Sequence, residues 1–182
     1  MVTIPMPAAS MVIAVDKGVD HLVGMHEASW IAIRDGIMGE MFPAAAKIAH
    51  GIATQDFAPN VESIVALNPD VVVQWGDEGT GIVGPLEDAG LDVVGLSYGT
   101  QRDLTEWITL FGTLLGQERR AKRLNARLDE RMTEIKNAAP GTSGTKPSIV
   151  YFNRFEGGLK VAARESYNDF YIDLVGGTNP AT

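Results

Sequence analysis

Residues 59–73 read PNVESIVALNPDVVV, a short helix followed by a strand, and this stretch decides the fold. Asn60 is a favourable N-cap, because its side-chain oxygen can accept a backbone N–H of the first helical turn. The apolar residues of Val61–Leu67 recur at helical spacing, which gives the predicted helix one buried face. Asn68-Pro69-Asp70 ends this helix, and Val71-Val72-Val73 continues as a fully apolar strand.

A second strand follows after one more predicted helix. Beyond a glycine-rich turn, Ile82–Ala89 has the pattern of a helix that ends at Gly90, and Val93–Leu96 is again rich in valine. Strand, helix and strand form a βαβ unit, and valine-rich strands without alternation are typical of a parallel sheet covered on both faces. We therefore predict an α/β fold: a parallel-sheet lobe with flanking helices, a long inter-lobe helix and an incomplete second α/β lobe.

The segments before this unit repeat the same order less clearly. Val2–Ile4 and Leu22–Val23 are predicted strands, and Ser10–Lys17 is a predicted helix that a glycine follows. Trp30–Met38 is also predicted to be helical, with a short continuation over Met41–Ile48.

Two helices are predicted after the βαβ unit. The first begins at Asp103 and ends near Leu115, and Asp103 and Glu106 have the spacing of a capping box in which Asp103 caps the helix. The second, Glu118–Asn137, has its apolar residues on one narrow seam among charged residues. At about 1.5 Å per residue it would be about 30 Å long, a length that suits a helix bridging two lobes.

The last part of the chain is predicted to begin a further lobe. Residues 140–145, PGTSGT, are linker-like, Ser148–Phe152 is a predicted strand and Ser166–Val175 a predicted helix. One strand and one helix cannot close a core of their own. We therefore predict three regions: an N-terminal α/β lobe at 1–116, the inter-lobe helix at 117–139, and the start of a C-terminal α/β lobe at 140–182.

Composition narrows the classes of function. The net charge of −8 argues against a nucleic-acid partner, because phosphate binding requires a basic surface, and it would repel an anionic membrane. Cysteine is absent, which excludes disulfides and thiolate chemistry. No apolar run approaches the roughly 18–20 residues of a membrane span. Residues 1–5 lack the features of a signal peptide, so we expect a cytosolic protein or the mature form of an exported one.

The stretch at 59–73 closely resembles the signature of the ferric-siderophore, cobalamin and haem class of ABC-importer binding proteins. In that family an N-x-E-x-I-x-x-L-x-P-D-x-V run forms the helix and strand beside the ligand cleft. Further matches follow in the family's order: Val2-Thr3-Ile4-Pro5 with the opening strand, Leu22–Met25 with an "L-V-G" strand, Leu86–Val94 with an "L-x-x-x-G-I-x-V" unit, Leu114-Leu115-Gly116 and Ala121 with the turn before the long helix, and Asp173–Asn179 with an "L-x-G-G-x-N" motif of the second lobe.

The resemblance implies the solute-binding component of an ABC importer, periplasmic or extracellular, with a removed signal or a lipid anchor compatible with it. Such a protein captures a metal chelate in an inter-lobe cleft and delivers it to a membrane permease; it is no enzyme and has no cofactor of its own. The chain departs from the family in two places. It has no arginine shortly after Pro5, and it ends at Thr182, where the family continues for most of another lobe. We therefore expect a fragment or a degenerate second lobe.

Ligands of parallel α/β sheets bind at the carboxyl ends of the strands, so the loops there supply the candidate ligand-binding residues. Tryptophan and tyrosine suit a flat macrocycle or a catecholate, because they combine apolar area with a polar tip. An arginine can pair with carboxylate or catecholate oxygens. Half-buried packing residues and solvated arginines are the alternative interpretation. The candidate residues are Gln74, Trp75, Tyr98, Arg102, Trp30 and, in the predicted second lobe, Arg154.

Glu62 has a different candidate role. The family uses one exposed acid on each lobe to dock with arginines of the permease, and Glu62 occupies the matching position of the motif. It lies beside the apolar face of its predicted helix, which indicates exposure. A solvated glutamate without function is the alternative, and the second docking acid would lie beyond Thr182.

The sequence predicts no metal site and no nucleotide site. His21, His26 and His50 lack the i, i+4 spacing of a helical ligand pair. The glycine-rich stretch 76–81 lacks the Lys-Ser/Thr of a P-loop, and Asp77 and Glu78 would repel phosphates, so we interpret it as a flexible rim of the cleft.

Two other classes of function stay open. An enzyme acting on metal complexes, a chelatase or a reductase, would need a placed acid–base or redox group, and the sequence contains no Ser-His-Asp order and no dinucleotide fingerprint. A stand-alone haem-binding or interaction module would use an uncovered apolar face. Among cargoes we expect a ferric siderophore first, followed by cobalamin, haem and oxyanions such as molybdate.

Overall fold

The computed structural model describes the chain except residues 78, 98, 140–144, 155–157 and 182, and it describes the backbone alone for residues 80, 153 and 154. The chain divides into two compact units, Met1–Tyr98 with Trp107–Lys122, and Gly99–Glu106 with Arg123–Thr182. This division runs through two helices. The predicted region boundaries at 116/117 and 139/140 stay predictions.

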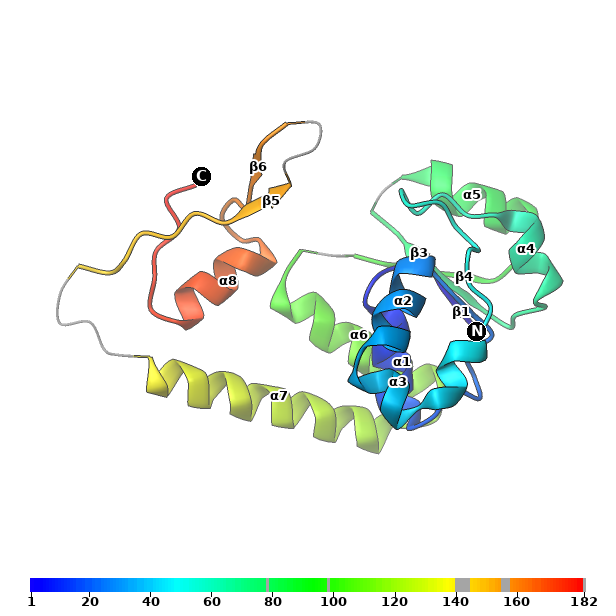
Figure 1. The fold of residues 1–182 in the computed structure, drawn as a ribbon, viewed down its shortest axis with the longest axis horizontal. Coiled ribbons are helices and arrows are strands. Elements are labelled where there is room, and N and C mark those ends of the chain that lie inside the picture. The colour runs from blue at the N-terminus through cyan, green and yellow to red at the C-terminus, as the bar shows by residue number, and fades with distance from the viewer. Residues whose placement is uncertain (78, 98, 140–144, 155–157, 182) are drawn as a thin grey trace. The chain divides into compact units, whose positions relative to one another are not determined.

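The first unit is built on a four-stranded parallel sheet (Figure 1). Val2 lies beside both Gly24 and Val72, and Val72 lies beside Val93. All three pairings are parallel, which confirms the predicted α/β fold. In spatial order the strands are β2 (Gly24–Met25), β1 (Val2–Thr3), β3 (Val72–Trp75) and β4 (Val93–Leu96).

One face of the sheet carries the main apolar core. Side chains alternate along a strand, so Val2 and Ile4 share this face. The helices α4 (Val61–Ala66) and α5 (Thr80–Asp88) cover it (Figure 1). Asn60 caps α4 as predicted, because its Oδ1 accepts the N–H of Ser63 at 3.2 Å. The core consists of Val2, Ile4, Ile52, Ile64, Val72 and Leu86.

The helices on the other side of the sheet differ from the prediction. Gly36 is extended, with φ −103° and ψ 178°, and it separates α2 from α3. The helix α2 also begins earlier than predicted, because Nδ1 of His26 accepts the N–H of Ala28 at 3.1 Å and caps it. The single helix predicted over Trp30–Met38 is therefore wrong. The elements here are α1 (Ala8–Asp16), α2 (Glu27–Asp35), α3 (Ile37–Met41) and the 3-10 helix η1 (Pro43–Lys47).

Two long helices, α6 (Gln101–Leu114) and α7 (Glu118–Ala138), follow the sheet. The helix predicted over Glu118–Asn137 is thus confirmed to within one residue. The small residues Gly112 and Ala121 let α6 and α7 approach closely, and a Cβ atom built on Gly112 would clash with that of Ala121. Neither these helices nor any other in the described ranges combines the length and the apolar character of a membrane span.

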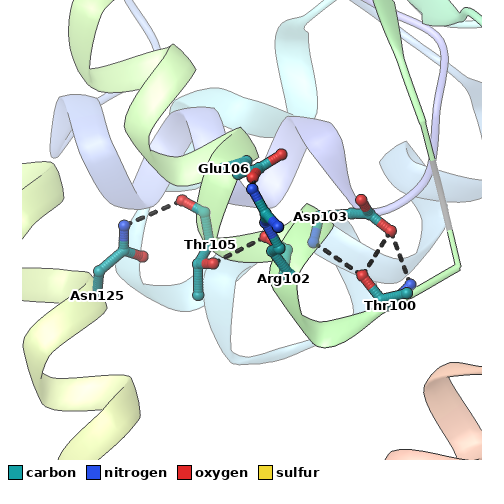
Figure 2. Close-up of polar contacts among 6 residues, drawn as sticks. All are labelled: Thr100, Arg102, Asp103, Thr105, Glu106 and Asn125. Atoms are coloured by element: carbon teal, nitrogen blue, oxygen red, sulfur yellow. Dashed lines mark hydrogen bonds and ion pairs between the residues drawn. The ribbon is translucent and has the colours of Figure 1, made fainter. Parts of the chain in front are cut away.

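The start of α6 corrects the predicted capping box. Thr100 supplies the cap: its Oγ1 accepts the N–H of Asp103 at 3.2 Å, and Oδ2 of Asp103 accepts the N–H of Thr100 at 2.7 Å (Figure 2). Asp103 is therefore the acid that reaches back, and Glu106 pairs with Arg102 instead. Within the second unit, Nδ2 of Asn125 donates to the carbonyl of Thr105 at 3.0 Å (Figure 2).

The second unit also contains the strands β5 (Phe152–Arg154) and β6 (Lys160–Val161), which pair antiparallel, and the helix α8 (Tyr167–Leu174). The predicted strand Ser148–Phe152 is displaced, because Ser148 forms only an isolated bridge to Thr178 and the strand begins at Phe152. The predicted helix Ser166–Val175 is confirmed to within one residue at each end, with Ser166 as its N-cap.

Candidate ligand-binding site

Four aromatic rings form a row at the carboxyl ends of the parallel strands. His26 follows β2, Trp75 ends β3, Phe57 lies in the loop 53–59, and Trp107 lies on α6. The ring centroids are 4.9 Å apart between His26 and Phe57, 5.9 Å between Phe57 and Trp75, and 5.5 Å between Trp75 and Trp107. These separations are typical of interacting aromatic pairs. We call these four residues the aromatic row.

Gln74 supports the aromatic row from within the sheet. Its side chain is fully buried, its Nε2 donates to the carbonyl of Phe57 at 2.9 Å, and its Oε1 accepts the N–H of Trp75 at 2.8 Å. A buried amide requires such partners. These contacts favour a supporting role for Gln74 over direct contact with a ligand, and its predicted ligand contact stays a prediction.

Trp107 joins the row through the end of β4. Its Nε1 donates to the carbonyl of Ser97 at 3.0 Å, and only 3% of the residue is exposed. In the sequence it has the pattern of a core residue on an amphipathic helix, and Phe57 lies in a segment without periodicity. Sequence reasoning therefore misses both residues, and only their aromatic character marks them.

Exposure differs along the aromatic row. Phe57 is half-buried, whereas His26 is 3% exposed and Trp75 is 8% exposed. Trp75 thus lies at the predicted edge of the sheet but presents little of its own surface there. Its contact with a ligand stays a prediction, and Phe57 is the member of the row with the most accessible ring.

The backbone that follows β3 runs very close to β4. A Cβ atom built on Gly76 would lie 3.0 Å from the Cα of Gly95, and one built on Gly95 would lie 2.9 Å from the Cα of Gly76. The N–H of Gly76 donates to the carbonyl of Leu96 at 2.8 Å. Only glycine fits at both positions without moving the backbone. Asp77 then follows as an exposed residue, and Glu78 lies outside the described residues.

Trp30 belongs to a second cluster, on α2. Its indole stacks on His50 with 3.9 Å between ring centroids, and the guanidinium of Arg34 lies 4.5 Å from the indole centroid. Nδ1 of His50 lies 2.5 Å from the carboxylate of Glu27. The hydrogen bond from Arg34 lowers the pKa of Asp35. Trp30 already has two stacking partners within the protein, and its contact with a ligand stays a prediction.

The other predicted ligand-binding residues lie elsewhere in the chain. The side chain of Arg102 is 83% exposed, and its Nε donates to Glu106 at 2.7 Å (Figure 2), a hydrogen bond that raises the pKa of Arg102. Tyr98 lies outside the described residues, and for Arg154 in β5 the backbone alone is described. The roles predicted for these three residues stay predictions.

Glu62 lies in the first turn of α4 and is exposed, as its pattern predicts. An acid at this position interacts favourably with the helix dipole, which is a sufficient structural reason for its presence. Its predicted role in docking a permease stays a prediction.

The histidines are engaged with the protein itself. Nδ1 of His21 lies 2.9 Å from Asp16, His26 caps α2, and His50 pairs with Glu27. In the part of the chain that the structure describes, no group of three or more histidine, aspartate or glutamate side chains could hold a metal ion.

A separate cavity of about 230 Å³ lies among α1, α2 and α3. The hydroxyl of Ser29, one of its lining residues, is buried without a hydrogen-bond partner among the described residues. Pockets that enclose a drug-sized ligand typically measure about 300–1,000 Å³. The aromatic row, not this cavity, is therefore the candidate site for a chelate. The lining residues are Pro7, Ser10, Ser29, Ala32, Ile33 and Met38.

Residues 53–182 match the model of a protein family described as periplasmic binding protein. No curated protein sequence gives a significant match.

Solved structures resemble the chain over nearly its whole length. A periplasmic solute binding protein from Veillonella parvula is 28% identical, with a TM-score of 0.79 over 100% of this chain and 54% of that one. A periplasmic haem-binding protein from Pseudomonas aeruginosa is 22% identical, with a TM-score of 0.77 over 100% of this chain and 62% of that one. A periplasmic vitamin B12 binding protein from Vibrio cholerae is 18% identical, with a TM-score of 0.68 over 98% and 64%. The chain thus spans 54% to 64% of the length of these three proteins.

Proposed function

Because the chain belongs to the periplasmic binding protein family, we propose that it is the solute-binding component of an ABC importer whose cargo is a metal chelate. The proteins of this family bind solutes. We infer that the protein works in the periplasm or at the outer face of the cell membrane, where a permease receives the cargo.

The aromatic row is the observation that carries this proposal. It lies at the carboxyl ends of parallel strands, the edge at which α/β proteins bind their ligands. Phe57, Trp75 and Trp107 form a continuous series of ring contacts there, with no charged side chain among them. The half-buried ring of Phe57, backed by the two buried indoles, suits the flat conjugated part of a ligand better than it suits a bare ion.

The aromatic row and the similar structures together support a metal chelate as the class of cargo. Two of them are named for binding haem and vitamin B12. These cargoes share with ferric siderophores a metal enclosed by an organic ligand. The exposed carboxylate of Asp77 at the same edge disfavours an oxyanion such as molybdate. We also propose Glu62 as a contact for the permease, because it is exposed on α4 and free of ion pairs among the described residues.

A fluorescence titration tests the binding proposal. All three tryptophans lie in the first unit, at positions 30, 75 and 107. A ferric siderophore, haem, cobalamin and molybdate are added separately to the chain and to any longer natural form of it. We expect saturable quenching by one chelate and none by molybdate.

Two matched variants show whether the aromatic row is the site. Trp75→Phe, in the row, should weaken the affinity measured from the quenching of the remaining tryptophans, whereas Trp30→Phe, in the α2 cluster, should leave that affinity unchanged. Quenching that depends on Trp30 alone would show that the ligand binds near α2 and not at the aromatic row. The absence of a response to every chelate would refute chelate binding.

A further inference from the structure

The loop 53–59 presents Phe57, the most accessible ring of the aromatic row, and its backbone is strained. Phe57 has φ +64°, in the left-handed region that disfavours side chains with a Cβ atom. Within the loop, Thr54 N–H donates to the carbonyl of Ala58 at 2.9 Å, and Phe57 N–H donates to the carbonyl of Thr54 at 3.0 Å. A strained conformation persists only where surrounding contacts hold it, and such conformations cluster at functional sites.

Two buried side chains hold the carbonyl groups of this loop. Nε2 of Gln74, at the end of β3, bonds the carbonyl of Phe57, and Nε2 of His26, after β2, bonds the carbonyl of Thr54, each at 2.9 Å. Gln74 is fully buried and His26 is 3% exposed, so water does not compete freely for either bond. The two side chains therefore anchor the loop at two points.

The partners of His26 dictate its protonation. The Thr54 carbonyl can only accept, so Nε2 must carry the hydrogen, and the Ala28 N–H can only donate, so Nδ1 must be bare. The ring is therefore neutral and is held as one tautomer. The backbone of His26 is engaged too, because its N–H donates to the Thr3 carbonyl at 3.1 Å and its carbonyl accepts the Trp30 N–H at 3.0 Å. One residue thus connects β1, α2 and the loop.

We propose that His26 is the positioning residue of the loop 53–59: as the neutral Nε2–H tautomer it ties the loop to the start of α2 and keeps Phe57 against Trp75. The importance of this role for cargo rests on the proposed function, because it takes the aromatic row as the ligand-binding surface. The hydrogen bonds of His26 and the conformation of the loop do not depend on that function.

Nitrogen NMR of the histidine rings tests the tautomer. Long-range ¹H–¹⁵N correlation spectra distinguish a protonated ring nitrogen from a bare one. At neutral pH we expect a protonated Nε2 and a bare Nδ1 for His26, and the exposed His21 serves as an internal reference. A bare Nε2, or averaging between the two tautomers, would overturn the proposal.

Amide hydrogen exchange tests the anchoring of the loop. In His26→Asn, the shorter side chain can still cap α2 but has no group at the position of Nε2. We expect the Phe57 and Thr54 amides to exchange about fivefold faster, the factor that corresponds to one ordinary hydrogen bond, while Ala28 stays protected. His26→Ala should accelerate both sites. The control His21→Asn should accelerate neither.

The outcomes separate this inference from the proposed function. Equal exchange of Phe57 in His26→Asn and the wild type would overturn the role of His26. If the wild type binds a chelate, His26→Asn should bind it more weakly under conditions in which both proteins are fully folded, and equal affinity would also count against that role. A wild type that binds no chelate, yet shows the expected tautomer and exchange, would refute the proposed function alone.

Discussion

The two units differ in how they bury their apolar side chains. In the first unit, Val2, Ile64 and Val72 are fully buried, because a parallel sheet is covered by helices on both faces. In the second unit, Phe152 and Val161 of the β5–β6 hairpin are 45% and 42% exposed. A two-stranded hairpin is only marginally stable in water. The first unit is therefore stabilised by the core on its sheet, whereas the hairpin of the second unit buries little apolar surface, and Ile172 and Leu174 of α8 are among the buried apolar side chains there.

The largest expected effect is a loss of stability when a core residue of the first unit is shortened. Ile64→Ala should lower the free energy of unfolding of the first unit by about 2–5 kcal/mol, because it removes fully buried methyl groups and leaves a cavity. Val161→Ala, at an exposed position of the second unit, should change stability by no more than about 0.5 kcal/mol. Urea unfolding monitored by tryptophan fluorescence reports the first unit, and circular dichroism reports the whole chain.

The control for this pair is the fluorescence transition of Val161→Ala, which should coincide with that of the wild type. Similar losses in the two variants would show that the hairpin is as well packed as the sheet. That result would refute the contrast between the units.

Removing a helix N-cap should lower stability by a smaller amount, which should be equal in the two units. Asn60 caps α4 in the first unit and Ser166 caps α8 in the second, each accepting a backbone N–H at 3.2 Å. Replacing either with alanine should cost about 1 kcal/mol, because capping is a local interaction. Amide exchange of Ser63 and Asp169 measures the two losses. A cost at Asn60 with none at Ser166 would mean that α8 is frayed before the substitution.

The smallest expected effect on the isolated protein concerns Glu62. Glu62→Arg should leave chelate affinity nearly unchanged and the core intact, because the side chain is exposed on α4. Uptake of the chelate by cells or vesicles that contain the permease should nevertheless fall. The matched control is Glu87→Arg on α5, another exposed helical acid of the same unit. Equal uptake by both variants and the wild type would remove Glu62 from the docking surface.

The sequence predicts those helices and strands whose signals, such as a cap residue or an apolar run, lie within a few neighbouring residues. The strand Val93–Leu96 is found at the predicted residues, and Asn60 caps the helix that it is predicted to cap. The capping box of α6 is harder, because Thr100 with Asp103 and Asp103 with Glu106 have the same spacing. Spacing alone therefore does not decide whether Thr100 or Asp103 caps α6. The hydrogen bond from Trp107 to the Ser97 carbonyl, which joins α6 to the end of β4, is not part of the capping pattern either.

The sequence predicts the edge of the sheet at which the candidate site lies, but it does not identify all the residues of the aromatic row. The rule that ligands bind at the carboxyl ends of parallel strands directs attention to Trp75 and to the edge where the aromatic row lies. It does not identify Phe57, which comes from a loop without a periodic pattern, or the cap formed by His26. The position of Phe57 depends on the bond between His26 and the Thr54 carbonyl, which joins residues 28 positions apart in the sequence. The cap is local, but histidine is not among the residues that favour N-caps.

The close approach of Gly76 and Gly95 limits how the sequence can vary at this edge of the sheet. Because the backbone of each glycine occupies the space that the other's Cβ atom would need, a side chain at either position would require the neighbouring backbone to shift. We therefore expect relatives of this chain to keep glycine at both positions, whereas exposed neighbours such as Asp77 are free to vary. Two residues without side chains thus set which positions at this edge of the sheet can vary.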